Sequence, residues 1–167
     1  MKDSDIKQTL RQLEKVWPRV AGKDMPAPPE GTAPKEGAAE ILAEMIGDEA
    51  AAERRCLCMA QGALGANASA LRRLAAESRG LTKKLQTEYY LRTGDSRPVP
   101  RHAQEACRPL GEALRLAWSS AGRAEGAYRA AAGRTDDDSL RELFLEAAER
   151  KRNQRALLRG LAGRLMR

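Results

Sequence analysis

Two polar residues interrupt an apolar stripe near the carboxyl end of the chain. Between residues 139 and 166, apolar side chains recur every three or four positions, which is the pattern of an amphipathic helix. Lys151 and Gln154 lie in the same stripe, between Ala147 and Leu158. Burying an unpaired amide costs about 2–7 kcal/mol, and burying an unpaired ammonium costs more. We therefore expect both side chains to have polar partners inside the protein.

A carboxylate on another predicted helix is the candidate partner. Residues 40–61 have the apolar spacing of an amphipathic helix, and Glu49 lies within the apolar face. A buried carboxylate calls for a cation, which Lys151 can supply. We predict an interior ion pair between Glu49 and Lys151, with Gln154 and Ser78 supplying hydrogen bonds. The alternative is that Lys151 extends along its methylene groups until its ammonium reaches water.

The same periodicity predicts helices over most of the chain after residue 38. Four long helices are expected, over about residues 40–61, 67–92, 109–132 and 139–166. β-branched residues are scarce, which argues against a sheet. About 15 residues separate the second and third helices, and an extended segment of that length can reach beyond about 40 Å. The predicted fold class is therefore all-α, a four-helix bundle with a long crossover between helices two and three.

The sequence of the amino-terminal part predicts a short helix and a linker that precede the bundle. Residues 1–21 contain a short amphipathic helix that Pro18 ends. Residues 22–38 are rich in Pro, Gly and charge without periodicity, which is typical of a linker. Residues 39–167 form the predicted bundle.

Charge and hydropathy limit the classes of partner. The net charge of +7 would suit an anionic partner such as nucleic acid. However, the sequence has no base-reading motif and no aromatic stacking platform, which argues against nucleic acid. No apolar run approaches the roughly 20 residues that span a bilayer. The first ten residues also lack a signal-peptide core. We expect a cytoplasmic protein without a membrane partner.

The chain has three cysteines, Cys56, Cys58 and Cys107. An odd number in a cytoplasmic protein is typical of reduced thiols. Cys56 and Cys58 are two residues apart on a predicted helix and point to different sides, which disfavours a redox pair or a chelate between them.

The four predicted helices resemble those of the rubrerythrin-like branch of the ferritin-like di-iron carboxylate proteins. The resemblance covers about residues 39–166. It is found in ILAEMIGDEAAAERRC, in LRRLAAESRGLTKKLQTEYYLRTG with its Tyr-x-x-x-Gly end, and in EALRLAWSSAGRAEGAYRAAAGRTDDDSLRELFLEAAERKRNQRALLRGL. Such proteins hold two irons with a Glu from each of two helices and a Glu-x-x-His from each of the other two. The resemblance implies a ferritin-like bundle.

Most positions that the resemblance aligns with iron ligands hold residues that cannot bind iron usefully. Glu49 matches the first-helix Glu. The second-helix Glu-x-x-His falls on Ser78 and Leu81, the third-helix Glu on Ala121, and the fourth-helix Glu-x-x-His on Lys151 and Gln154. The single histidine of the chain, His102, is in the crossover and is interpreted as a solvated loop residue. We therefore expect a dismantled di-iron site without metal, in which Leu81 and Ala121 contribute apolar volume.

The acidic residues also allow a different metal site. Glu49 and Glu53 are one helical turn apart, and with Glu77 or Glu125 they could bind one hard cation through oxygen atoms. Glu77 and Glu125 are instead interpreted as flanking or surface residues.

The predicted function is a non-catalytic, rubrerythrin-like bundle with a structural or protein-interaction role, without a cofactor and with an unidentified protein partner. The alternative is an enzyme or iron-binding protein, for which the resemblance implies iron-dependent peroxide reduction. A further alternative is a basic bundle on nucleic acid, which predicts an affinity that falls steeply with salt. The resemblance also implies a homodimer, in which the long crossover allows helices to be exchanged between protomers.

Overall fold

Four long α-helices account for most of the residues that the computed structural model describes, which are 36–99 and 107–165. The helices are α2 (Glu36–Gln61), α3 (Gly65–Thr93), α4 (Leu110–Arg134) and α5 (Asp138–Leu165), and the described residues contain no strand. The all-α prediction is therefore confirmed. Helix α2 begins inside the segment predicted as linker. The predicted helix within residues 1–21, the rest of the linker and His102 lie outside the described residues.

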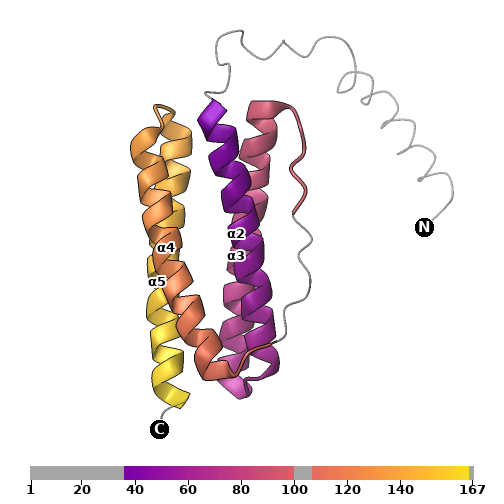
Figure 1. The fold of residues 1–167 in the computed structure, drawn as a ribbon, viewed down its shortest axis with the longest axis vertical. Helices are drawn as coiled ribbons and strands as arrows, with labels where there is room; N and C mark the ends of the chain where they lie inside the picture. Colours follow the sequence, from indigo (N-terminus) through magenta and orange to yellow (C-terminus); the bar gives the residue numbers. More distant parts are fainter. Residues whose placement is uncertain (1–35, 100–106, 166–167) are drawn as a thin grey trace, which may run out of the picture. The chain divides into compact units, whose positions relative to one another are not determined.

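The helices form a bundle of two antiparallel hairpins joined by the crossover. Helix α2 packs along α3, and α4 packs along α5 (Figure 1). Helix α3 ends at the top of the view and α4 begins at the bottom, so the two helix ends that the crossover joins lie at opposite ends of the bundle (Figure 1). Backbone contacts among the described residues also join α2 to α4 and α3 to α5. The pairs α2 with α5 and α3 with α4 therefore face each other across the diagonals.

The helix ends show which local signals stop and start the helices. Gly94 ends α3 with a left-handed φ of 75°, and its N–H donates to the Tyr90 carbonyl at 2.8 Å. At the start of α5, the Leu140 N–H donates to Asp137 Oδ1 at 2.9 Å. Asp137 therefore caps α5, whose first helical residue is Asp138.

The interior contains two apolar clusters, one toward each end of the bundle. The first cluster comprises Cys56, Met59, Ala60, Ala63, Ala68, Leu71, Leu74, Ala75, Leu114, Ala117, Ala121, Leu158 and Leu161. The second comprises Leu42, Met45, Ile46, Leu81, Leu85, Tyr128, Ala131, Ala132, Leu140, Phe144, Ala147 and Ala148. Burial of these side chains, at about 25 cal/mol per Å² of apolar surface, is the main stabilisation of the bundle. None of the described helices is long and apolar enough to cross a membrane.

Candidate functional site

A layer of buried polar side chains lies between the two apolar clusters. Each of the four helices contributes to it, at the position where its residues pass from one cluster to the other. The layer consists of Glu49, Ser78, Glu125, Lys151 and Gln154. Buried polar groups are costly unless they are hydrogen-bonded, so the partners of each side chain define what this layer can do.

The centre of the layer is an ion pair across a diagonal of the bundle. Lys151 Nζ on α5 donates to Glu49 Oε2 on α2 at 2.7 Å. The two side chains are 4% and 1% exposed. The structure thus brings together the two residues expected to pair, and it keeps the Lys151 ammonium away from water. Both charges have lost their hydration, so each depends on the other and on the polar atoms around them.

Two neutral side chains complete the hydrogen bonding of this pair. Tyr128 on α4 donates its hydroxyl to Glu49 Oε1 at 3.0 Å. Lys151 Nζ also donates to Gln154 Oε1 at 3.1 Å, one helical turn along α5. The two carboxylate oxygens of Glu49 therefore accept from different helices, α4 and α5. Burial, and next the negative charge of Glu49, raise the pKa of Tyr128 well above its usual value, so the hydroxyl keeps its proton.

Tyr128 is not among the site residues predicted from the sequence, so its role as a hydrogen-bond donor was missed. A signal was present, because a buried tyrosine hydroxyl usually has a hydrogen-bond partner. Its ring packs 6.2 Å from that of Phe144, at an interplanar angle of 42°. The ring thus belongs to the second apolar cluster while the hydroxyl belongs to the polar layer.

The hydrogen bonds extend from Gln154 to the free thiol of Cys56. Gln154 Nε2 donates to Cys56 Sγ, with 3.9 Å between the two atoms. Cys56 is 1% exposed, and burial raises its pKa to about 11. The side chains of Tyr128, Glu49, Lys151, Gln154 and Cys56 therefore form one continuous chain of contacts through three helices.

The remaining aligned positions contribute volume rather than polar contacts. Ser78 is buried, and its carbonyl accepts from Thr82 Oγ1 at 3.0 Å. Among the described residues, no hydrogen bond joins the Ser78 side chain to Glu49 or Lys151, so the expectation that Ser78 supports the pair was wrong. Leu81 and Ala121 are buried in the second and first apolar clusters, respectively.

Glu125 belongs to a second cluster in the layer, on the α4–α5 side. Arg155 Nη1 lies 3.2 Å from Glu125 Oε2, and Arg129 Nη1 lies 2.5 Å from Oε1. The Arg155 guanidinium also stacks over the Trp118 ring at 4.5 Å from its centroid. Burial acts to raise the pKa of Glu125, but the two arginines outweigh it and lower the pKa below its usual value. Gly122 makes room for this guanidinium, since a Cβ there would lie 3.2 Å from Arg155.

The interpretation of Glu125 as a flanking or surface residue was therefore wrong, because it is 7% exposed. Its spacing could have indicated burial. Glu125 follows Ala121 by four residues and precedes Tyr128 by three, so the three side chains share one face of a helix on which Ala121 was expected to be buried.

Three of the four acidic residues of the alternative cation site have basic partners instead. Glu53 Oε1 lies 2.6 Å from Arg79 Nη2, Glu49 pairs with Lys151, and Glu125 pairs with two arginines. Glu77 is exposed on α3. Within residues 36–99 and 107–165, no group of three or more His, Cys, Asp and Glu side chains could hold a metal ion.

The residues present do not fit a di-iron centre. Such a centre needs several carboxylates to balance two metal charges, with imidazoles completing the coordination. At the six aligned positions only Glu49 is a carboxylate and none is a histidine. Its oxygen atoms are engaged by Lys151 and Tyr128. An ammonium thus already neutralises the single carboxylate that such a metal would use.

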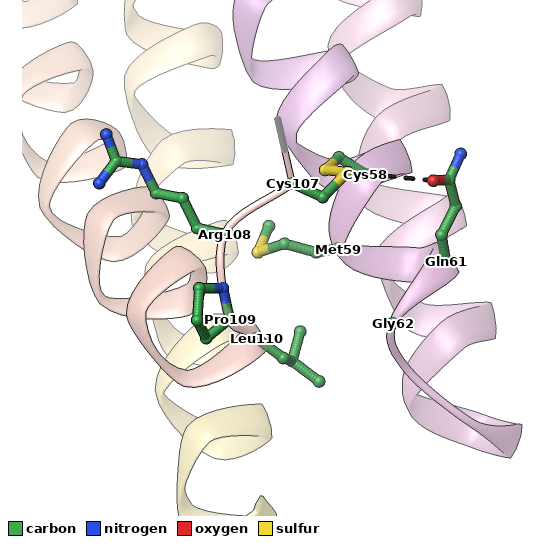
Figure 2. A pocket seen from close by; sticks show the side chains of 8 residues that line it. All are labelled: Cys58, Met59, Gln61, Gly62, Cys107, Arg108, Pro109 and Leu110. Atoms are coloured by element: carbon green, nitrogen blue, oxygen red, sulfur yellow. Dashed lines mark hydrogen bonds between the residues drawn. A yellow bond between two sulfur atoms is a disulfide. The ribbon is translucent and has the colours of Figure 1, made fainter. Parts of the chain in front are cut away.

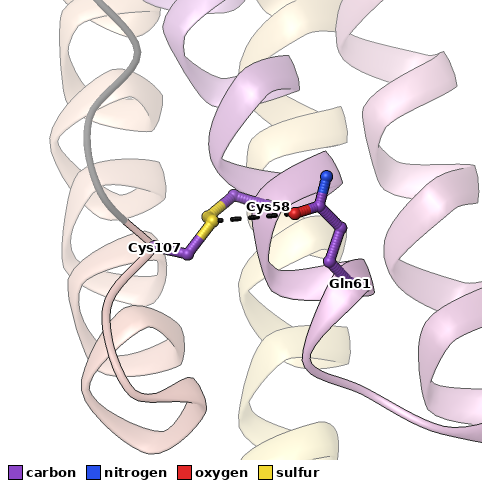
Figure 3. The surroundings of a disulfide bond; sticks show 3 residues. All are labelled: Cys58, Gln61 and Cys107. Atoms are coloured by element: carbon purple, nitrogen blue, oxygen red, sulfur yellow. Dashed lines mark hydrogen bonds between the residues drawn. A yellow bond between two sulfur atoms is a disulfide. The ribbon is translucent and has the colours of Figure 1, made fainter.

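The cysteines differ from the expectation of three reduced thiols. Cys58 on α2 and Cys107, just before α4, form a disulfide (Figure 3), while Cys56 is free. Their Cα atoms are 5.8 Å apart, inside the usual range of about 4.4–6.8 Å. The expectation was wrong because it compared only cysteines close in sequence. The crossover returns the chain to the end of α2, which places Cys107 beside Cys58.

Comparisons with known proteins agree with the fold. No family model and no curated protein matches the sequence. Among solved structures, the chain is similar to a hypothetical protein, Pfu-1136390-001, from Pyrococcus furiosus. The TM-score is 0.69 at 18% sequence identity, and the match covers 77% of this chain and 89% of that chain. At this identity the similarity shows the fold alone, and together with the described helices it defines an all-α four-helix bundle.

Proposed function

We propose that this chain is a non-catalytic, rubrerythrin-like bundle in which a buried ion pair has replaced a di-iron site. The observation that supports the proposal is the Lys151 ammonium, 2.7 Å from Glu49 at the centre of the bundle. It occupies the position that the family resemblance gives to a carboxylate ligand. All six positions aligned with ligands are buried, as positions around an interior metal should be.

The ion pair makes iron binding at this position unfavourable for two reasons. A metal would have to displace Lys151 from Glu49, which leaves a buried ammonium unpaired. It would also find a single carboxylate, because Leu81 and Ala121 supply no ligand atoms. The peroxide-reducing alternative requires that iron centre, so the proposed role is structural or one of protein interaction.

Iron content after anaerobic loading is the direct test. The full chain is incubated with excess Fe(II) without oxygen, desalted, analysed for metal by mass spectrometry and scanned for absorbance on addition of peroxide. We expect no retained iron and no spectral change. Near two irons per chain with an oxo-bridge band would overturn the proposal and favour the enzyme.

A variant that restores the ligands tests the positional alignment separately. It combines Ser78→Glu, Leu81→His, Ala121→Glu, Lys151→Glu and Gln154→His, and it keeps Glu49. If these are the former ligand positions, the variant should bind iron where the wild type does not. The matched control has every substitution except Lys151→Glu, because the retained ammonium should weaken uptake. A folded variant that binds no iron would contradict the derivation from a di-iron protein.

The proposal also includes a cytoplasmic location and a homodimer. Cell fractionation tests the location, and sedimentation equilibrium of the full chain tests the dimer. A monomer at micromolar concentration would contradict the proposed homodimer. It would not affect the proposal that an ion pair has replaced the metal site.

A further inference from the structure

The disulfide is a covalent link between the end of α2 and the segment that precedes α4. Cys58 lies near the end of α2, and Cys107 lies at the far end of the crossover, 49 residues later. Neither residue belongs to an apolar cluster, whereas Cys56, two positions before Cys58, belongs to the first one. The first apolar cluster joins the same two helices independently of the disulfide, because it includes Met59 of α2 and Leu114 of α4, with Leu110 packed against it.

The link is accessible from solvent. Cys107 is exposed and Cys58 is half-buried. Both line a surface pocket of about 440 Å³, and Figure 2 shows Met59 reaching from α2 toward the segment that leads into α4. The pocket is completed by Gln61, Gly62, Arg108, Pro109 and Leu110. Thiol–disulfide exchange requires a thiolate to approach a sulfur atom, so its rate depends on such access.

The third cysteine, Cys56, should not take part in thiol–disulfide exchange. Cys56 is buried, accepts a hydrogen bond from Gln154, and has a pKa that burial raises to about 11. A buried thiol with a raised pKa is a poor nucleophile. Opening of the disulfide should therefore leave Cys58 and Cys107 as the two reactive thiols, without exchange to Cys56.

We propose that Cys58–Cys107 is a reversible, redox-sensitive link that releases Cys107 and the segment before α4 from α2 while the bundle stays folded. A thiolate of a dithiol reductant attacks the exposed Cys107 sulfur, and Cys58 leaves as a thiolate that takes up a proton. The second thiol of the reductant then attacks the mixed disulfide and frees Cys107. Two electrons and two protons pass to the protein, and the reductant becomes a disulfide. This inference does not depend on the proposed replacement of the metal site.

Differential alkylation of the full chain tests the link. The protein is treated with or without dithiothreitol under native conditions, alkylated with N-ethylmaleimide, and mapped by peptide mass spectrometry. Untreated protein should take up no reagent, and reduced protein should take up two equivalents, on Cys58 and Cys107. Cys56→Ala is the control that should behave identically. Alkylation of Cys58 and Cys107 in oxidised, untreated protein would overturn the proposal, as would resistance to dithiothreitol until denaturant is added.

Hydrogen exchange then tests whether reduction releases the segment. Peptides covering Cys107 and the segment before α4 should exchange faster after reduction, and peptides covering the middle of α5 should not change. Cys107→Ser should show the same pattern without reductant. Unchanged exchange in the segment before α4 would exclude a release. Loss of helical circular dichroism together with alkylation of Cys56 would show that the disulfide stabilises the whole fold and is not a local switch.

Discussion

Lys151 Nζ lies 2.7 Å from Glu49 Oε2, although the two residues come from helices that face each other across a diagonal of the bundle. The pair therefore spans the interior rather than bridging two adjacent helices. Such a pair is weak evidence for stability, because its attraction largely offsets the cost of removing both charges from water. The loss of either partner alone should nevertheless be costly, because it leaves the other charge buried without a counter-ion.

Removing only the ammonium should strongly destabilise the protein. Lys151→Ala leaves Glu49 buried without a cation, and we expect the free energy of unfolding to fall by about 3–5 kcal/mol. Urea denaturation followed by circular dichroism measures this loss. Lys84→Ala is the control, because Lys84 pairs with Glu146 at the surface, with side chains 48% and 43% exposed. That pair should contribute only about 0–1 kcal/mol. A Lys151→Ala variant as stable as wild type would contradict a buried pair.

Replacing both charged residues together should lower the free energy of unfolding far less than replacing one of them. The double variant Glu49→Leu with Lys151→Met fills a similar volume with apolar groups. Its stability should lie near or above wild type, since replacement of a buried pair is often neutral or stabilising by about 1–4 kcal/mol. The same urea curves, compared with both single variants, give the coupling energy between the two positions. A double variant that loses as much as the two singles combined would mean that the charges do not interact.

The Tyr128 hydroxyl should contribute measurably through its bond to Glu49. Tyr128→Phe keeps the ring against Phe144 and removes one donor to a buried carboxylate. A hydrogen bond to a charged group contributes about 1.5–3 kcal/mol, so we expect a loss of that order in thermal or urea unfolding. Tyr90→Phe is the matched control, because Tyr90 is 55% exposed and should tolerate the change. Equal effects of the two substitutions would argue against the buried hydrogen bond.

Asp137 should make the stability depend on pH below neutrality. The hydrogen bond from the Leu140 N–H, and next the contact with Arg92, lower its pKa below the usual value of 3.8. The folded-state pKa is thus below the unfolded one, so its stabilisation is present above about pH 3.8 and is lost as the pH falls through the folded-state pKa. Asp137→Asn keeps the helix cap and should remove this part of the pH dependence.

Asp137→Ala also removes the cap of α5, which typically costs about 0.5–2 kcal/mol at neutral pH. Melting temperatures of wild type and both variants between pH 7 and pH 2 separate the two effects. If Asp137→Asn and wild type lost stability in parallel over the acidic range, the folded-state pKa would not be lowered.

Loss of the disulfide should lower stability without abolishing the fold. The crosslink closes a loop with a sequence separation of 49 residues, for which the chain-entropy model gives about 4 kcal/mol. We expect Cys107→Ser to lose up to this amount in urea unfolding under oxidising conditions. Wild type with dithiothreitol should coincide with the variant. A difference between those two curves would show that serine at 107 perturbs more than the crosslink.

Much of this architecture could be predicted from the sequence, because its signals are local. Apolar spacing of three and four residues places the helices to within about four residues of their observed ends. The same spacing places Glu49, Lys151 and Gln154 on buried faces. Opposite charges on two buried faces predict an ion pair. The structure brings Glu49 and Lys151 together as predicted. The length of the crossover indicated that α4 starts at the same end of the bundle as α3.

The tertiary structure alone decided which side chains meet. The burial of Glu125 depends on how closely α4 and α5 approach, and the Glu49 contact of Tyr128 depends on α2 lying beside α4. The disulfide depends on where the crossover returns to α2, which no residue spacing specifies. Helical periodicity defines which side of one helix is buried, but it contains no information on the distance or rotation between helices. That geometry is set when the side chains of all four helices pack together.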